Sequence, residues 1–251
     1  FDPLDDYMDT ILQQMMATVD GGLAREGVLP GDLKLKRIAK ELKQKADTAK
    51  SAAEREKLLL CAYAYSASEE NASGSMTVTA PTLGSSGILP ALVCYYHRIL
   101  GVSREQLRNG LKVAGLFGNL IKENATISGA QGGCQAEIGA AVAMGAAMVS
   151  YLRGQTMRQI EYAAEIGIEH HLGLTCDPVG GYVMIPCIER NAVGVLRAMD
   201  AAVLAEGISD LREHKVSFDM VVNTMNYTGR KIPIELRETS LGGLARVVPL
   251  K

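Results

Sequence analysis

Three of the chain's five cysteines lie in or beside glycine-rich segments, where their thiols could act as metal ligands. Cys134 follows the run Ser-Gly-Ala-Gln-Gly-Gly, and Cys176 and Cys187 bracket the segment Asp-Pro-Val-Gly-Gly-Tyr-Val-Met-Ile-Pro. Cys134 and Cys187 are each expected to open a helix, where the positive end of the helix dipole lowers a thiol pKa and favours the thiolate. Thiolates are the soft ligands that hold iron–sulfur clusters, and the glycines would let backbone N–H groups approach the cluster sulfides closely.

The spacing of these cysteines does not by itself identify a metal site. They are 42 and 11 positions apart, which matches no ferredoxin pattern and no compact zinc knuckle. Unrelated structural thiols are therefore the alternative interpretation. The other two cysteines, Cys61 and Cys94, lie within apolar helical segments and are typical of small buried hydrophobic residues.

Longer segments around the three cysteines resemble the iron–sulfur-dependent L-serine dehydratases, in the catalytic alpha chain or domain. The resemblance extends over about residues 60–245, including Thr228-Gly. Its motifs are SGSMTVTAPTLGSSGILPA (73–91), SGAQGGCQAEIG (128–139), EHHLGLTCDPVGGYVMIPCIERNA (169–192) and ETSLGGLA (238–245). The resemblance implies a mainly helical fold and the activity of an L-serine ammonia-lyase, an enzyme of amino-acid catabolism that supplies gluconeogenesis.

The resemblance also implies a [4Fe–4S] cluster, whose three ligands here would be Cys134, Cys176 and Cys187. Three ligands leave one iron open to bind the serine hydroxyl and carboxylate, and Lewis-acid chemistry there would help the hydroxyl to leave. Loss of water gives aminoacrylate, which yields pyruvate and ammonia.

Two features depart from the family pattern. No beta domain is present, so a beta chain or a missing beta domain is expected as a partner, and no cysteine follows Cys187 to occupy the open iron as in some single-chain members.

The remaining chemistry needs a substrate cradle and a base. His170, six residues before Cys176, is our first candidate for the base, and Lys122 is the second; a structural histidine and a surface lysine are the alternatives. Glu137 is expected to order a helix cap or to support the cluster ligands. The candidate substrate-binding residues are Ser73, Ser75, Thr79, Thr82, Ser85, Ser86, Arg190 and Asn191. The same hydroxyls could instead cap their own loop, and Arg190 and Asn191 could instead bond to neighbouring helices.

Other functions remain open at the sequence level. A pyridoxal-phosphate lyase would catalyse the same reaction, but no lysine lies beside the Ser-Ser-Gly motif at residues 85–87 to form its Schiff base. A related elimination from threonine or cysteine would use the same open iron. A non-catalytic helical module with structural cysteines is the third alternative.

Helical periodicity predicts the elements that position these residues. Apolar residues at helical spacing, with acidic residues near the start, predict a helix over residues 4–23. Residues 33–57 hold nine basic and four acidic residues and predict a solvated helical hairpin, or else a site for an anionic partner. Further helices are expected at 58–71, 88–100, 104–123, 134–153, 157–168, 186–206 and 217–227. No strand-length run stands out beyond residues 76–79.

We therefore expect one mainly α-helical domain over residues 1–251, with a helical N-terminal part (1–71) and a core that carries the cluster and substrate loops (72–251). The helix at 134–153 is rich in alanine and glycine, which predicts a buried helix among closely approaching neighbours. Three Gly/Ser-rich loops, at 72–87, 124–133 and 175–186, are expected to form the active site.

Composition narrows the classes of protein further. The 251 residues include 26 Lys and Arg against 28 Asp and Glu, a net charge of −2 that argues against a nucleic-acid binder. The most apolar stretch, at 138–152, is too short to span a bilayer, which needs about 20 apolar residues, so no membrane association is expected. Scattered cysteines and no visible signal peptide predict a cytoplasmic protein with free or metal-bound thiols. An oligomer is also expected. Phe1 in place of an initiator methionine indicates part of a longer chain.

Overall fold

Four helices of this chain begin at a short polar side chain that caps their free N–H groups. In the computed structural model, which describes residues 3–248, Ser103 and Thr156 each form a capping box with the glutamine three residues later. Ser51 and Ser217 also cap helices through their side chains. These residues set the starts of four helices in the chain.

The described residues form eleven α-helices, one π-helical turn and two 3₁₀ turns, without a strand. The predicted mainly helical fold is therefore confirmed. The elements are α1 (Pro3–Ala24), α2 (Ala39–Asp47), α3 (Ala52–Ala72), α4 (Ile88–Arg98), α5 (Arg104–Asn124), α6 (Gly129–Gly132), η1 (Gln135–Gly139), α7 (Ala140–Leu152), α8 (Met157–Glu169), η2 (Val179–Gly181), α9 (Cys187–Ile208), α10 (Phe218–Lys231), η3 (Ile234–Leu236) and α11 (Gly243–Val247).

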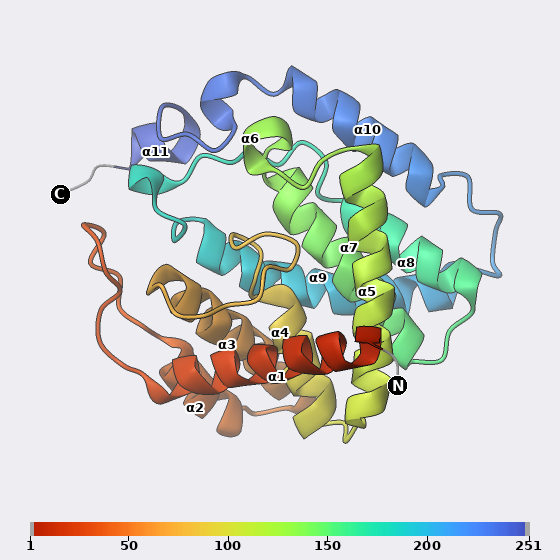
Figure 1. The fold of residues 1–251 in the computed structure, drawn as a ribbon, viewed down its shortest axis with the longest axis horizontal. Helices are drawn as coiled ribbons and strands as arrows, with labels where there is room; N and C mark the ends of the chain where they lie inside the picture. Colours follow the sequence, from red (N-terminus) through yellow and green to blue (C-terminus); the bar gives the residue numbers. More distant parts are fainter. Residues whose placement is uncertain (1–2, 249–251) are drawn as a thin grey trace.

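Helix α7 lies at the centre of the bundle, surrounded by α4, α5, α8 and α9 (Figure 1). All its residues from Ala140 to Ser150 are buried. Small side chains allow this packing: a Cβ on Gly145 would lie 2.8 Å from Leu92 Cδ1 and 3.1 Å from Ala198 Cβ. Helices α1, α3 and α4 pack together on one side of the bundle, and α10 covers α8 on another.

The charged segment at 33–57 forms the expected helical hairpin only from Ala39 onward, because residues 33–38 are not helical. One of its basic residues is also not on the surface. Arg37 is buried and its Nη1 lies 2.9 Å from Glu70 Oε1, so this charge ties the segment to α3. No helix within residues 3–248 is long and apolar enough to cross a membrane.

Candidate metal centre and catalytic pocket

Two of the three candidate cysteines meet at a buried carboxylate. The ligand atoms of Cys134, Glu137 and Cys176 all lie within 4.8 Å of one another. Glu137 Oε2 is 3.8 Å from Cys134 Sγ and 3.7 Å from Cys176 Sγ. Two cysteines that are 42 positions apart in the sequence are therefore neighbours across one carboxylate.

Cys187 lines the same pocket as Cys176 and Glu137. This cysteine pocket has a volume of about 540 Å³, and loops from four parts of the chain form its walls. Its lining residues are Thr79, Thr82, Leu83, Gly84, Ile127, Ser128, Gly129, Glu137, Cys176, Pro178, Gly181, Val183, Cys187 and Glu238. All three predicted loops thus contribute to one cavity, together with a C-terminal residue.

Glycine keeps space open around the carboxylate and the thiols. A Cβ on Gly129 would lie 2.6 Å from Glu137 Oε2 and 3.3 Å from Cys176 Sγ, so any side chain there would fill the cradle. Gly133, just before Cys134, has a φ of +74° and packs so closely that a Cβ would lie 2.6 Å from Leu174 O. This left-handed conformation favours glycine.

The side chain of Gln135, the first residue of η1, links the Cys176 loop to α10. Its Oε1 accepts a hydrogen bond from Gly173 N (2.9 Å), and its Nε2 donates to Met225 O (3.1 Å) on α10. Its backbone N–H donates to Leu174 O. Gln135 is fully buried, so these bonds hold the loop that leads to Cys176 at a fixed place beside Cys134.

The C-terminal segment 236–244 fastens the other side of the Cys176 loop. Cys176 N donates to Leu236 O (2.8 Å), and Glu238 N donates to Cys176 O (2.6 Å). Asp177 Oδ2 accepts a hydrogen bond from Leu244 N at 2.7 Å. The segment also brings the Glu238 carboxyl group to the cysteine pocket.

The pKa values of the neighbouring thiols Cys134 and Cys176 are shifted in opposite directions. A hydrogen bond with Cys176 lowers the pKa of Cys134, as does the positive charge of Arg190, and the same bond together with burial raises the pKa of Cys176. Burial raises the pKa of Cys187 to about 12. The expectation that the helix start would favour a thiolate at Cys187 is therefore wrong for the metal-free protein, because desolvation outweighs the dipole there. A metal that binds thiolates would displace these protons.

Burial also raises the pKa of Glu137, while the hydroxyl of Thr82 opposes the shift by donating to Glu137 Oε1 at 2.8 Å. The charge of Glu238 raises the pKa of Glu137 further. The pocket therefore holds a carboxyl group that retains its proton more strongly than an exposed glutamate does. Sequence reasoning assigned Glu137 only a supporting role and assigned Glu238 no role.

Of the six candidate hydroxyl residues, Thr79 and Thr82 line the cysteine pocket. Ser85 and Ser86 are buried and bond to carbonyls of their own loop, Ala80 O and Leu83 O respectively. The other two serines bond to arginines: Ser73 Oγ accepts a hydrogen bond from Arg37, and Ser75 Oγ accepts one from Arg25. These four serines shape the loop, and the two threonines face the cavity.

Arg190 and Asn191 support the pocket from the first turn of α9. Arg190 Nη1 donates to Thr175 O at 2.7 Å, and its charge acts on Cys134. Asn191 Oδ1 accepts from Gly87 N (2.9 Å), and its Nδ2 donates to Gly84 O and to Cys187 O (both 2.8 Å). Asn191 therefore ties the hydroxyl loop to the helix that begins at Cys187.

Neither candidate base lines the cysteine pocket. His170 is exposed at the end of α8, with its Nε2 3.9 Å from Glu169 Oε2, and it lines a different pocket. Lys122 is exposed in the last turn of α5. Cys134 does not line the pocket itself and is linked to it through its neighbours Glu137 and Cys176. Of the two cysteines away from this group, Cys94 is fully buried and Cys61 is half-buried, with its Sγ 3.7 Å from Ala192 O.

The donor set of the pocket fits a metal ion or a metal cluster. Cysteine thiolates and a carboxylate are established ligands of transition metals, and two thiols and the carboxylate already lie within reach of one another. The absence of a side chain at Gly129 leaves space beside the Glu137 carboxyl group and the Cys176 thiol. This fit depends on the side chains present and is compatible with more than one kind of metal group.

Comparisons with known proteins identify the family of the chain. A family model described as the serine dehydratase alpha chain matches residues 2–245. The chain is similar to an L-serine dehydratase of Streptomyces coelicolor, at 45% identity over 94% of this chain and 51% of the relative. It is also similar to L-serine dehydratase 1 of Escherichia coli, at 43% identity over 96% of this chain and 54% of the relative. An L-serine dehydratase of Mycobacterium tuberculosis is 45% identical over 89% of this chain and 49% of the relative. The chain thus spans about half the length of these relatives.

Proposed function

The chain belongs to the serine dehydratase alpha-chain family, and from that premise we propose that the cysteine pocket is the catalytic site of an L-serine ammonia-lyase. The observation that carries the proposal is the meeting of Cys134, Cys176 and Glu137 within 4.8 Å. The names of the relatives support serine as the substrate.

We propose that Cys134, Cys176 and Cys187 hold a [4Fe–4S] cluster. When bound, the cluster would supply a Lewis-acidic iron that stabilises the departing hydroxyl of serine. The cradle at Gly129 and the shared pocket of Cys176 and Cys187 support this assignment. Arg190 would balance part of the thiolate charge at Cys134.

The chain's own polar groups would bind and orient the substrate. Glu238 lies in the same pocket as Glu137, and its carboxylate is the natural partner for the serine ammonium group. Thr79 and Thr82 offer hydroxyl donors to the serine carboxylate. Asn191 and the serines at 73, 75, 85 and 86 act indirectly, because they hold the loop that presents the two threonines.

We propose that Glu137, rather than His170 or Lys122, takes the proton from Cα. Glu137 lies inside the pocket, and its raised pKa makes the ionised carboxylate a stronger base than an exposed glutamate. Thr82 holds Oε1 of this carboxyl group at 2.8 Å, which leaves Oε2 directed toward the thiols. Loss of the proton and of the hydroxyl yields aminoacrylate, which tautomerises and hydrolyses to pyruvate and ammonia.

The same proposal includes a second polypeptide or domain, an oligomeric assembly and a cytoplasmic setting. The relatives are about twice as long as this chain, and the family model describes an alpha chain, which supports a beta partner. A reducing compartment would keep the five thiols free. Catabolism of serine to pyruvate would feed gluconeogenesis.

An anaerobic turnover assay tests the proposal. The protein is reconstituted with iron and sulfide and incubated with L-serine, and pyruvate is measured with lactate dehydrogenase. L-Threonine and L-cysteine serve as competing substrates. We expect pyruvate from L-serine and a change in the cluster's absorption when serine binds, and we expect Cys176→Ala to lose both. Iron-loaded protein that forms no pyruvate and shows no spectral response to serine would contradict the proposal.

A further inference from the structure

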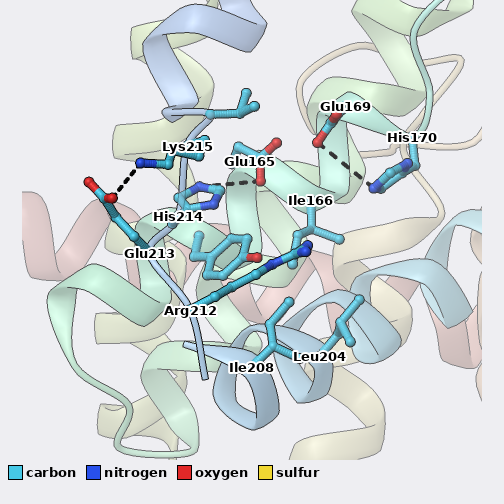
Figure 2. Close-up of a pocket in the computed structure, with 12 residues that line it drawn as sticks. Glu165, Ile166, Glu169, His170, Leu204, Ile208, Arg212, Glu213, His214 and Lys215 are labelled. Carbon is cyan, nitrogen blue, oxygen red and sulfur yellow. Dashed lines mark hydrogen bonds and ion pairs between the residues drawn. The ribbon is translucent and has the colours of Figure 1, made fainter. Parts of the chain in front are cut away.

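A second polar pocket lies away from the cysteines and shares no lining residue with the cysteine pocket. Its volume is about 640 Å³, and it is formed by α8, the end of α9 and the segment 212–216 before α10. Figure 2 shows two glutamate–histidine pairs in it, Glu165 with His214 near the centre of the view and Glu169 with His170 at the upper right. These four side chains, Glu165, Glu169, His170 and His214, are called the Glu–His cluster below.

The innermost member of the cluster is a buried carboxyl group that receives no hydrogen bond from an N–H or hydroxyl group at its Oε1. The side chain of Glu165 is 1% exposed, and the Glu169 carboxyl group lies close enough to share a proton with it. A buried polar atom without a partner is costly and rare in native proteins. Because Glu165 lines the pocket, either a shared proton or a cation from the pocket would satisfy this pair of carboxyl groups.

His214 supplies a second unpartnered atom beside it. Its Nε2 lies 3.5 Å from Glu165 Oε2 and forms no hydrogen bond. The imidazole ring packs on Tyr162, with ring centroids 3.6 Å apart, so its orientation is restrained. Figure 2 shows the ring turned toward Glu165. An oriented imidazole nitrogen next to a carboxylate oxygen is a common beginning of a metal site.

Glu169 and His170 complete the donor set on the open side of the pocket. Glu169 is one turn after Glu165 on α8, so both carboxyl groups lie on the same helix face. His170 Nε2 is 3.9 Å from Glu169 Oε2. Both residues are at the C-terminal end of α8, where the negative end of the helix dipole favours a cation.

The four side chains form two neighbouring pairs, Glu165 with His214 and Glu169 with His170, and do not surround a single point in this structure. Glu169 and His170 have side chains that are 37% and 66% exposed, so they are free to rotate toward Glu165. Arg212 and Lys215 also line the pocket, but Lys215 is paired with Glu213. A single ion would require Glu169 and His170 to rotate until two carboxylate oxygens and two imidazole nitrogens meet.

We propose that the Glu–His cluster binds one divalent transition-metal ion, with Zn²⁺ the best match. Imidazole nitrogen and carboxylate oxygen are ordinary zinc ligands, and four of them complete a tetrahedral site. The ion would link α8 to the segment 212–216 and would use both unpartnered atoms. The inference does not depend on the proposed dehydratase activity.

Titration of the anaerobic protein with Co²⁺, followed by displacement with Zn²⁺, tests the proposal. Bound Co²⁺ has visible d–d absorption, and a thiolate-to-cobalt charge-transfer band reports any binding at the cysteines instead. We expect one equivalent of Co²⁺ that contributes no thiolate band and is released by Zn²⁺, in addition to any Co²⁺ that binds at the cysteines. Glu165→Gln and His214→Asn should each weaken this binding by roughly tenfold or more. Burial and the hydrogen bond with Glu169 raise the pKa of Glu165 to about 9, so glutamine resembles the protonated side chain and the variant should fold.

Glu213→Gln is the matched control. Glu213 lines the same pocket, but its side chain is 73% exposed and is paired with Lys215. This variant should bind Co²⁺ as the unmodified protein does. The proposal is overturned if the protein binds no Co²⁺, if the thiolate band accompanies all of the bound Co²⁺, or if Glu165→Gln binds as tightly as Glu213→Gln.

Discussion

Replacing Gly243 with alanine would disturb the contact between the C-terminal segment and the Cys176 loop. Gly243 has a φ of +56°, and an added Cβ would lie 1.9 Å from Asp177 Oδ2. The same oxygen accepts the hydrogen bond from Leu244 N. The alanine methyl group therefore cannot fit unless Asp177 gives up that bond, and Asp177 is the residue that follows Cys176.

Two costs contribute to the expected loss of stability. A non-glycine residue in the left-handed conformation costs roughly 1–2 kcal/mol. Loss of a hydrogen bond to a charged group costs about 1.5–3 kcal/mol more. We therefore expect Gly243→Ala to reduce the free energy of unfolding by about 2.5–5 kcal/mol.

Gly154→Ala is the matched control, because Gly154 has a φ of +73° but no atom within 4 Å of an added Cβ. It should cost only the backbone strain of roughly 1–2 kcal/mol. Urea denaturation of both variants under anaerobic conditions measures the difference, and iron retention measures its effect on the Cys176 loop. Equal losses of stability in the two variants would refute the claim that the Asp177 contact holds this segment.

Three further predictions follow from individual side chains. Glu137→Gln should retain iron but lower kcat for serine by about 10²–10⁴-fold, as measured by pyruvate formation; an unchanged kcat would exclude Glu137 as the base. Asn191→Ala leaves three backbone groups near Gly84, Gly87 and Cys187 without their partner, and should cost about 3 kcal/mol in urea denaturation; a loss below about 1 kcal/mol would contradict it. Burial raises the pKa of Glu69, so folding takes up a proton and this contribution to stability is lost as the pH rises. Melting curves should therefore show Glu69→Gln gaining stability relative to the unmodified protein from about pH 5 to about pH 8, and a constant difference would contradict this.

The helices could be predicted from the sequence because their signals are local. Thr156 and Gln159 form the capping box at the start of α8, and Ser217 caps α10 at the residue where the predicted helix begins. The short segment 33–38 was harder to predict. Arg37 is held there by Glu70 from α3, and a buried ion pair between distant residues has no periodicity to reveal it.

The candidate site could be predicted only as a set of residue types. The motifs identified the cysteines and the loops, but the position of Cys176 depends on Gln135 and on the backbone of residues 236–238. Glu238 reaches the pocket through a conformation with φ +59°, which its residue type does not predict. The raised pKa of Cys187 results from burial, a tertiary property that outweighs the local effect of the helix start.

Iron and sulfide content per chain, measured after anaerobic reconstitution, tests the central claim most directly. The account predicts about four iron and four sulfide ions in the unmodified protein and in Cys61→Ala and Cys94→Ala, whose thiols lie outside the pocket. Alanine at Cys134, Cys176 or Cys187 should remove most of the iron. Full iron content in all three of these variants would contradict the assignment of the cysteine pocket as the cluster site.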